Sequence, residues 1–485
     1  MKEQSACEQP IPLDLMLATY AKVVGSGIFL SRRELDEVVE TSGRHALWFY
    51  RIEKVLLDAV KLTVDPELKE VEAHLTLEAA LIDRIIAEYA QQFPDFSFDH
   101  KAEKARLASL SPISRKARCF GRRGCVILPA TATESEVAAQ FDDRETSMPF
   151  NPERSGNTDL PRGQGSKAID EAVDLAFADS DAATSAVVIL HKGQIIAERY
   201  RDGVDATTPL ESWSMGKGLT ATLVGMLVQA GALDPDKPAP IPEWHAKGDP
   251  RSEITVRHLL QMSGGLDFSG KDDPRSDWAH GVSDHEYIYT EAVDTFRLSI
   301  EKGMKYPPGT CGRYRNCDTL ALGLIIRRYV EDNLGRPYLT WPQEELFDVL
   351  KADPQILETD WFGNFVMSGF NYGPARNWAK LGLLYLQKGV WKGKRLLPTN
   401  WGEQISTPSP AWDEPEFGGQ VWLNRTKTYE LPSEAYYMAG SGEQRVFIVP
   451  SIDLVIVRMG FRADNDAPTS TTKKMCAALM RANWT

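Results

Sequence analysis

The sequence predicts an α+β fold whose central antiparallel sheet is flanked by helices and built from both ends of the C-terminal two thirds of the chain. Two strand-like runs follow one another closely at 185–190 and 195–200. A second pair, at 445–449 and 454–458, surrounds a turn sequence at 450–453. The sequence between the pairs is mostly helical, so strands far apart in the chain have to meet in one sheet.

Each end of this predicted domain also carries a helix. From Lys167 onward, apolar residues recur at helical spacing and define an inward face of Ile169, Ala172, Val173 and Ala176. A final helix is expected over about 472–481. Ahead of the domain, we expect a helix over 76–91 with Thr76 as its N-cap, and a short strand at 126–128.

The chain of 485 residues is long enough for one large domain and a second unit. We expect residues 1–130 to form an N-terminal α/β extension, whose role the sequence does not indicate. The stretch 131–165 is polar and rich in proline, glycine and asparagine, which is typical of a linker or a long wrapping loop. Residues 166–485 then form the predicted sheet domain.

Composition and charge limit the binding partners and the cellular compartment that we expect for this protein. The formal net charge of −13 argues against nucleic acid or an anionic membrane surface as the main partner. The stretch 13–30 is moderately apolar, but Asp14 and Lys22 interrupt it, and we expect no membrane span. A cytoplasmic location is expected, because no basic region followed by an apolar region opens the sequence. A periplasmic location would require a signal removed ahead of the numbered sequence.

The six cysteines show no metal-binding pattern, because none forms a Cys-x-x-Cys pair and no histidine stands near them at ligand spacing. Cys119 and Cys125 are close enough in sequence to close a small loop by a disulfide. In a reducing compartment we expect ordinary thiols instead.

The strongest chemical signal is a serine and a lysine three residues apart at the start of an apolar run. Ser214 and Lys217 precede residues 218–230, which carry no charge, and Gly231 then ends the run. This pattern predicts a buried helix with Ser214 at its N-terminal end, where the hydroxyl and the amine would meet on one face. A desolvated lysine has a lowered pKa and can take the proton of a serine, while the helix N-terminus favours an oxyanion.

The Ser-x-x-Lys pattern alone also fits a helix N-cap serine followed by an exposed lysine. It recurs at Ser299 and Lys302 and again at 470–473, in charged or polar surroundings with no long apolar helix after it. We interpret these two copies as solvated surface.

Two further segments carry residues suited to acyl transfer. A Pro-Pro-Gly turn leads to Tyr314 and Asn316, ahead of another apolar helix. A phenol can relay a proton and an amide can donate to a carbonyl, although a core tyrosine and a capping asparagine would show the same pattern. Gly440 and Ser441 stand just before a predicted strand, where small residues expose backbone N–H groups to a substrate. A simple glycine-rich turn is the alternative.

Together, these segments resemble the serine beta-lactamase-like hydrolases, which include class C beta-lactamases, DD-peptidases, family VIII esterases and 6-aminohexanoate-dimer hydrolases. The resemblance covers about residues 165–485. It rests on the patterns at 214–217, 254–266, 314–316 and 440–442, which occur in the family's order. It implies a beta-lactamase/DD-peptidase-like fold, in which a helical domain accompanies the sheet.

The resemblance also implies a role for each matched position. Ser214 matches the acylated nucleophile and Lys217 the lysine that takes its proton. Tyr314 matches the tyrosine that shares the role of base, and which of the two is the true base is left open. Asn316 matches the residue that orients the lysine and the substrate. The backbone N–H groups of Ser214 and Ser441 match the oxyanion hole, and no metal or organic cofactor is implied.

One departure from the family pattern bears on the substrate. Where penicillin-recognising relatives carry Lys-Thr-Gly, this sequence has methionine, alanine and glycine at 438–440, which offer no positive charge to a substrate carboxylate. We therefore expect a serine hydrolase that cleaves small neutral carboxylic esters through an acyl-enzyme. The alternatives are an amidase for small linear amides or D-amino-acid peptides, then beta-lactamase or penicillin-binding activity, and, from another class, a non-catalytic scaffold. A homo-oligomer is left open.

The natural substrate is expected to depend on loops at about 266–300 and 360–376. Trp278, Tyr287 and Tyr289 in the first loop either shape a pocket or pack as an ordinary exposed loop. His258 is expected to be structural, because it lies in an apolar helix-like run.

Overall fold

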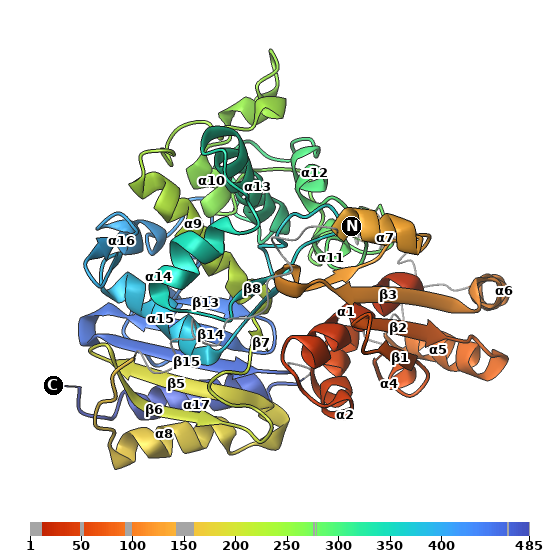
Figure 1. Cartoon of the computed structure of the whole chain (residues 1–485), viewed down its shortest axis with the longest axis horizontal. Helices are drawn as coiled ribbons and strands as arrows, with labels where there is room; N and C mark the ends of the chain where they lie inside the picture. The colour runs from red at the N-terminus through yellow and green to blue at the C-terminus, as the bar shows by residue number, and fades with distance from the viewer. Residues whose placement is uncertain are drawn as a thin grey trace, which may run out of the picture. The chain divides into compact units, whose positions relative to one another are not determined.

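The computed structural model describes residues 12–48, 53–92, 99–141, 160–274, 277, 279–462 and 465–484. They divide into two units. The first lies within Met1–Arg144, Phe268–Asp294 and Asp360–Phe362, and the second within Glu145–Asp267, Thr295–Thr359 and Gly363–Thr485. Each unit has its own sheet and its own hydrophobic core (Figure 1).

The second unit is organised around a six-stranded sheet in the order β12-β13-β14-β15-β5-β6, with every neighbouring pair antiparallel. Its strands are β5 (Thr184–His191), β6 (Gln194–Tyr200), β12 (Trp422–Leu423), β13 (Tyr436–Gly440), β14 (Gln444–Val449) and β15 (Leu454–Gly460). The last strand pairs with the first, with Val457 opposite Val188. The predicted α+β fold, with one sheet made from both ends of the domain, is therefore confirmed.

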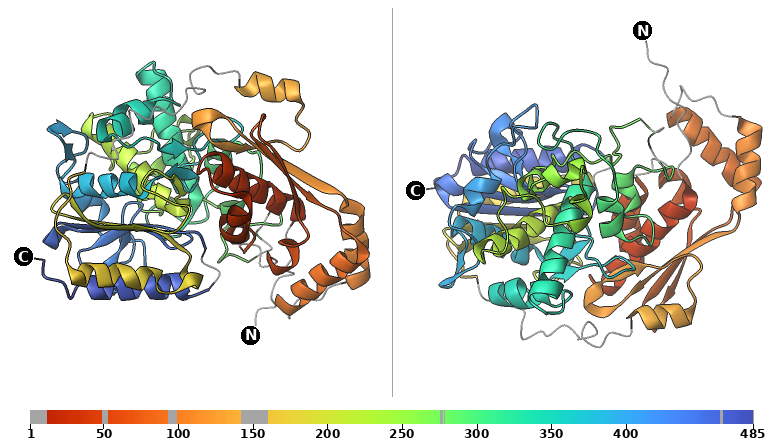
Figure 2. Two further views of the ribbon diagram at one scale, coloured as in Figure 1. Left: turned by 60° about the horizontal axis from the view of Figure 1, so that its bottom comes forward. Right: turned by 90° about the horizontal axis from the view of Figure 1, so that it is seen from above.

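Helices cover both faces of this sheet (Figure 2). Helices α8 (Lys167–Phe177) and α17 (Ala467–Leu479) lie together on one face, and α15 (Ala375–Leu386) packs against β5, β14 and β15 on the other. The buried residues of α8 are the four that the periodicity predicts: Ile169, Ala172, Val173 and Ala176. Apolar spacing of 3.6 residues thus decides which side of the helix meets the sheet.

The middle of this unit is mostly helical, as the sequence predicts. Its helices are α9 (Gly216–Gln229), α10 (Val256–Leu260), α12 (Thr295–Ile300), α13 (Asn316–Arg328), α14 (Asp348–Leu350) and α16 (Trp401–Ile405). Short strands β7 (Leu210–Glu211), β8 (Ile356–Leu357) and β9 (Asn371–Gly373) form a small sheet in the order β7-β9-β8, and β10 (Val390–Trp391) pairs with β11 (Lys394–Arg395). The small sheet is important for the site, because β9 lies beside the chain that leads into α9.

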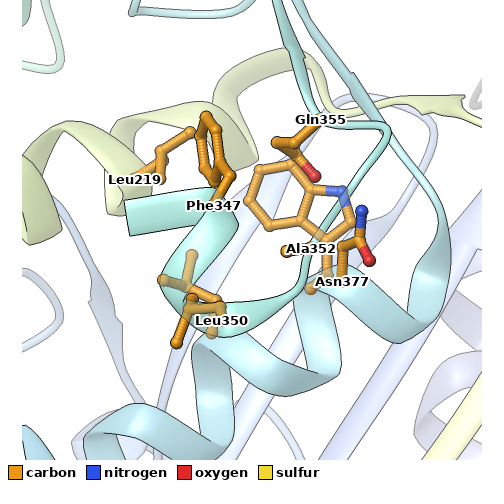
Figure 3. Close-up of a pocket in the computed structure, with 8 residues that line it drawn as sticks. Leu219, Phe347, Leu350, Ala352, Gln355 and Asn377 are labelled. Atoms are coloured by element: carbon orange, nitrogen blue, oxygen red, sulfur yellow. The ribbon is translucent and has the colours of Figure 1, made fainter. Parts of the chain in front are cut away.

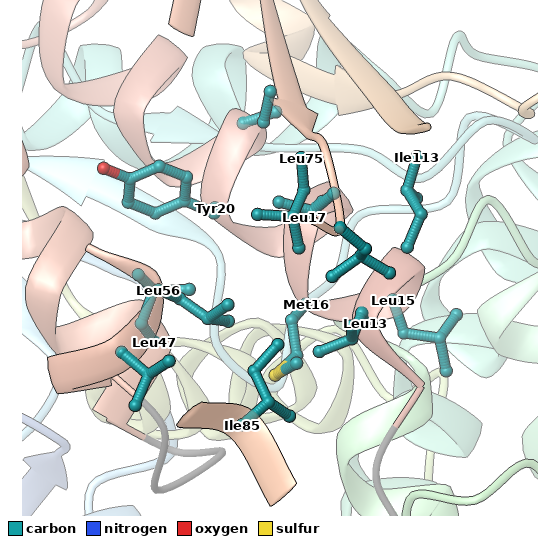
Figure 4. Close-up of a cluster of buried hydrophobic side chains, with 14 of the residues drawn as sticks. Leu13, Leu15, Met16, Leu17, Tyr20, Leu47, Leu56, Leu75, Ile85 and Ile113 are labelled. Atoms are coloured by element: carbon teal, nitrogen blue, oxygen red, sulfur yellow. The ribbon is translucent and has the colours of Figure 1, made fainter. Parts of the chain in front are cut away.

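The first unit is a four-stranded antiparallel meander with helices. Its strands are β1 (Lys61–Asp65), β2 (Glu70–Leu75), β3 (Ile113–Cys119) and β4 (Cys125–Ile127), in the order β1-β2-β3-β4. Its helices are α1 (Leu13–Phe29), α2 (Leu35–Val38), α3 (Arg44–Trp48), α4 (Glu53–Leu56), α5 (Ala79–Gln92), α6 (His100–Leu110), α7 (Glu134–Phe141) and α11 (Asp284–Tyr287). The apolar helix α1 packs on β2, β3 and β4 and supplies much of the core (Figure 4).

A segment from the middle of the chain completes the first unit. Val282, on the segment Phe268–Asp294, is part of the core of the first unit, and Tyr287 packs against that core. The buried guanidinium of Arg115 on β3 makes an ion pair with Glu291 at 2.6 Å. Much of the loop expected to shape the substrate pocket is therefore part of the first unit. The first unit consists of three separate stretches of the chain, which boundaries at 130 and 165 do not describe. Those domain boundaries stay a prediction.

Several local expectations differ from the structure. Helix α5 begins at Ala79 rather than after Thr76, and the backbone N–H of Leu77 donates to Ser111 Oγ ahead of it. Helix α17 begins at Ala467, earlier than expected, with a proline in its first turn, where a missing N–H does no harm. Within the expected linker, helix α7 forms, and residues 142–159 lie outside the described part.

The expectation of free thiols at Cys119 and Cys125 is wrong. The two residues face each other in the β3–β4 pair, and their sulfurs form a disulfide. The tight turn between the strands places them opposite one another, which the spacing alone does not decide.

Candidate active site

Ser214 lies at the entrance to helix α9, as the sequence predicts. It occupies the 3-10 turn Trp213–Met215, directly before Gly216, and it is partly exposed. Trp213 has a φ of 45°, which is the left-handed region that side chains other than glycine rarely adopt. Such a conformation persists only where the surrounding structure holds it, and it is common at active sites.

The neighbouring chain holds this turn in place. The backbone N–H of Ser212 donates to the carbonyl of Asn371 at 2.9 Å, and its hydroxyl donates to the carbonyl of Gly369 at 3.1 Å. The turn that carries Ser214 is therefore anchored on the segment that enters β9.

Lys217 lies inside the protein, one helical turn from Ser214. Its side chain is only 1 % exposed, and its Nζ lies 3.1 Å from Ser214 Oγ. Nζ also donates to the carbonyl of Ser368 at 2.7 Å. Burial lowers the pKa of the Lys217 amine well below its ordinary value, because the charged form is desolvated. A neutral amine can donate to the carbonyl and still present a lone pair to the serine hydroxyl.

Tyr314 reaches the same hydroxyl from the start of helix α13. Its phenol shares a hydrogen bond with Ser214, and its ring centroid lies 4.9 Å from Lys217 Nζ. Burial raises the pKa of Tyr314 to about 12, although the hydrogen bond to Ser214 and the charge of Arg445 act in the opposite direction. The phenol is therefore protonated at neutral pH and serves more readily as a proton donor than as a base.

Aromatic residues surround Tyr314. Trp422 stacks with it at a centroid distance of 5.5 Å, and Phe417 meets it edge-on at 6.0 Å. Trp412 in turn stacks on Phe417 at 4.7 Å. This cluster fixes the ring of Tyr314 and makes its side of the site apolar.

Asn316 is the first residue of α13 and is fully buried. Its position two residues after Tyr314 is the one that the Tyr-x-Asn pattern predicts. The same helix start also buries the carboxyl group of Asp318, which accepts a hydrogen bond from the backbone N–H of Gly264 at 3.0 Å.

Gly440 brings the third predicted segment to the turn that holds Ser214. A Cβ added to Gly440 would lie 3.1 Å from the backbone nitrogen of Ser214 and 2.9 Å from that of Met215, and it would overlap the carbonyl of Ser212. Only glycine allows this approach. Ser441 follows immediately, in the turn between β13 and β14. The structure therefore brings Ser214, Lys217, Tyr314 and the end of β13 together.

Met438 packs in the interior rather than offering a polar group. A Cβ added to Gly218 on α9 would overlap the side chain of Met438, which is fully buried. Met438, which we expect at the position of the lysine in penicillin-recognising relatives, is thus an apolar, buried side chain.

Two parts of the site were missed by sequence reasoning. The carbonyl of Ser368 has no sequence signature, because any residue carries a carbonyl and only the fold brings it to Lys217. Arg445 on β14 donates to the carbonyl of Gly440 at 3.0 Å. An arginine at the first position of the predicted strand 445–449 gave no signal of its own.

Other candidates from the sequence lie elsewhere. His258 accepts from the backbone N–H of Thr255 in a capping box, which agrees with a structural role. Ser299 is buried on α12 and donates to the carbonyl of Thr295, so its interpretation as solvated surface is wrong. Tyr287 stacks on His280 within the first unit, and Trp278 lies outside the described residues.

A small pocket borders α9 but does not reach the serine (Figure 3). It is lined by Leu219, Phe347, Leu350, Ala352, Gln355, Asn377, Trp378 and Leu381. None of the residues around Ser214 lines it, so we do not assign it to the substrate.

In the described part of the chain, no group of three or more histidine, cysteine, aspartate or glutamate residues is arranged to hold a metal ion. Likewise, none of the described helices combines the length and apolar character needed to cross a membrane.

The fold and the serine–lysine arrangement define a class of protein, the serine hydrolases of beta-lactamase fold. Residues 167–360 match the family model described as Beta-lactamase. A curated relative, the 6-aminohexanoate-dimer hydrolase of Paenarthrobacter ureafaciens, is 24% identical over 307 residues, which cover 58% of this chain and 74% of the relative.

Solved structures share the fold at lower identity. A putative 6-aminohexanoate-dimer hydrolase from Bacillus anthracis superposes with a TM-score of 0.53 at 20% identity, covering 71% of this chain and 93% of that one. A penicillin-binding protein homolog from Caulobacter crescentus has a TM-score of 0.51 at 14% identity, covering 65% of this chain and 99% of that one.

Proposed function

We propose that this protein hydrolyses carboxylic esters of small substrates through an acyl-enzyme on Ser214. The observation that carries the proposal is the buried amine of Lys217, 3.1 Å from Ser214 Oγ, with a pKa lowered by burial. A base and a nucleophile in hydrogen-bond contact are the first requirement of covalent acyl transfer.

In the acylation step, the neutral amine of Lys217 takes the proton of Ser214 as Oγ attacks the substrate carbonyl carbon. Lys217 is the better base of the two candidates, because the pKa of Tyr314 is raised to about 12 while that of Lys217 is lowered. Tyr314 stays protonated during the attack and donates a hydrogen bond to the oxygen of Ser214. When the intermediate collapses, Tyr314 gives its proton to the leaving alkoxide and takes in its place the proton that Lys217 carries.

The negative charge of the tetrahedral intermediate needs donors already in place. We assign this role to the backbone N–H groups of Ser214 and Ser441, since Gly440 seats the end of β13 against the turn that carries Ser214. Asn316 is assigned to orienting Lys217 and the substrate. In the second half of the reaction, water attacks the acyl carbon and gives a proton to Lys217. The bond from that carbon to Ser214 Oγ then breaks, and Lys217 returns the proton to Oγ.

A second candidate activity is hydrolysis of small linear amides. It is favoured by the curated relative and by one solved structure, both of which carry the name 6-aminohexanoate-dimer hydrolase. Beta-lactam hydrolysis has less support, because the buried Met438 offers no cation to a substrate carboxylate.

The test compares wild type with Ser214→Ala on four substrates: p-nitrophenyl acetate, p-nitrophenyl butyrate, the linear dimer of 6-aminohexanoate, and nitrocefin. Ester turnover that is lost in the variant supports the proposal. Turnover of the linear dimer at a kcat/KM above that of the esters would replace it with the amidase. Nitrocefin turnover that rivals the esters would show that the interpretation of Met438 is wrong.

A further inference from the structure

The turn between β13 and β14 is held by a network of side-chain hydrogen bonds and an ion pair. Residues 441–443 connect the paired ends Gly440 and Gln444, and Gly442 and Glu443 have φ values of 77° and 60°. Positive φ values are common in hairpin turns, but Glu443 is a non-glycine residue in the left-handed region, and its side chain is held by contacts around the turn. Side chains from β14 and β15 supply these contacts.

Arg445 is the side chain that hydrogen-bonds to the turn on the side of Gly440. Its Nη1 donates to the carbonyl of Gly440 at 3.0 Å and to that of Gln444 at 2.8 Å. Its Nη2 pairs with Glu443 Oε2 at 2.6 Å, and its Nε donates to the Tyr429 hydroxyl at 2.9 Å. The Tyr429 hydroxyl in turn donates to Glu443 Oε1 at 2.7 Å, which closes the network.

These contacts make Arg445 a fixed group rather than a free cation. Its charge is neutralised by Glu443, and its planar fork is engaged on three sides. Because of these contacts, moving the guanidinium would break several hydrogen bonds at once. Arg445 is therefore suited to holding backbone in one orientation and poorly suited to receiving a substrate carboxylate.

The backbone that it holds is the peptide between Gly440 and Ser441. In a trans peptide the C=O and the N–H point in opposite directions. A guanidinium on the carbonyl of Gly440 therefore directs the N–H of Ser441 away from β14. Gly440 itself lies against the backbone nitrogen of Ser214, on the turn that carries the nucleophile.

We propose that Arg445, supported by Glu443 and Tyr429, is a positioning residue that fixes the Ser441 N–H as the second donor of the oxyanion hole. The inference rests on the proposed function and extends it from the residues that touch the substrate to one that acts through the backbone. Without the guanidinium, the carbonyl of Gly440 loses this side-chain donor and the orientation of the Gly440–Ser441 peptide is less tightly fixed, which weakens the hole without removing the nucleophile or the base.

The test uses Arg445→Lys, Arg445→Ala and Tyr429→Phe, with Arg199→Ala as the matched control, since Arg199 pairs with Asp174 at the surface of the same unit. Lysine keeps the charge but cannot engage two carbonyls and a carboxylate in one plane. We expect kcat for p-nitrophenyl butyrate to fall at least 10-fold in Arg445→Lys while KM changes less than 3-fold. Loss of a direct oxyanion donor lowers kcat by about 10²–10³-fold, which sets the upper range.

A transition-state analogue provides the specific measurement. Butylboronic acid forms a tetrahedral adduct with a nucleophilic serine, and its oxygen would occupy the oxyanion hole. Its Ki should rise in parallel with the loss of kcat in Arg445→Lys and stay unchanged in Arg199→Ala. A merely structural role would instead lower the active fraction, as titrated with a fluorophosphonate, and leave kcat per labelled site unchanged.

Two kinetic results would overturn the inference. One is an unchanged kcat and boronate Ki in folded Arg445→Lys. The other is a rise in KM confined to esters with a carboxylate, which would make Arg445 a substrate receptor. Hydrogen exchange of the hairpin peptide covering 436–449 tests, without any activity measurement, whether Arg445 fixes the Gly440–Ser441 peptide. Exchange at the Ser441 N–H should be faster in Arg445→Lys. An inactive wild type would refute the proposed function, whereas unchanged hydrogen exchange at Ser441 in Arg445→Lys would refute the positioning role of Arg445.

Discussion

The Nζ of Lys217 donates a hydrogen bond to the backbone carbonyl of Ser368, 151 residues away in the chain, at 2.7 Å. This contact gives the buried amine a partner that carries no charge. The amine is thus oriented toward Ser214 without a carboxylate that would stabilise its protonated form. The contact with Ser368 thus sets the orientation of the amine, whereas burial lowers its pKa.

Lys217→Met should abolish acylation without unfolding the protein. Methionine fills a similar volume but has no amine that could accept a proton, so the loss in ester turnover should be about 10²–10⁴-fold or more. Fluorophosphonate labelling and circular dichroism measure the two effects. Near-normal turnover in the variant would exclude Lys217 as the base.

The same variant should change how stability depends on pH. The folded protein holds Lys217 neutral below its ordinary pKa of 10.5, whereas the unfolded chain is protonated there. The unfolded state therefore binds more protons, and this contribution to wild-type stability rises with pH. The advantage of Lys217→Met in free energy of unfolding should be larger at pH 6 than at pH 9, measured by urea titration. A constant difference would mean that the amine is charged in the folded state.

Gly440→Ala should damage both activity and stability. Its Cβ would overlap the carbonyl of Ser212 and press on the nitrogen of Ser214, so β13 has to move away from the turn. We expect kcat to fall about 10²-fold or more and the free energy of unfolding to fall by about 1–3 kcal/mol. Gly303→Ala is the control, because nothing lies within 4 Å of its added Cβ. Equal activity of both variants would place β13 outside the site.

Asp318→Asn should stabilise the protein at alkaline pH. Burial raises the pKa of Asp318 from 3.8 to about 7, so the folded state holds a proton that the unfolded state releases between those values. Wild-type stability from this group therefore falls as pH rises from about 4 to about 7. The shift corresponds to about 4 kcal/mol at most.

The asparagine variant has no such proton to lose, and its oxygen can still accept from the backbone N–H of Gly264. The gain in stability over wild type should therefore be larger at pH 8 than at pH 5, by thermal or urea unfolding. The exposed Asp202→Asn serves as the control. A gain that does not grow with pH would show that Asp318 titrates normally.

Glu291→Ala should destabilise the first unit. It removes the 2.6 Å partner of Arg115, whose side chain is 2% exposed, and leaves only Asp14 at 3.5 Å. Breaking a buried pair usually costs about 3–5 kcal/mol, and the remaining aspartate reduces the expected loss to about 2 kcal/mol. Glu301→Ala, from an exposed pair with Arg297, should change stability by less than about 0.5 kcal/mol. Equal melting temperatures would show that the pair with Glu291 is unimportant.

Elements whose signal is local were predicted well. The inward face of α8 and the terminal hairpin of β14 and β15 follow from periodicity and strand pattern, which depend on nearby residues. The start of α5 was misplaced, in a segment where a distant residue, Ser111, accepts the backbone N–H of Leu77. The disulfide between Cys119 and Cys125 was misjudged for a related reason, since it depends on how β3 and β4 align.

The sequence by itself determined the sheet domain, the helix that begins beside Ser214 and the spacing that brings Lys217 to its hydroxyl, because hydrophobic periodicity and one helical turn are local properties. Only the tertiary structure decided that Ser368 supplies the carbonyl for Lys217, that Arg445 holds the carbonyl of Gly440, and that 268–294 completes the first unit. These contacts join backbone and side chains far apart in the chain, and their positions follow from packing rather than from any local pattern.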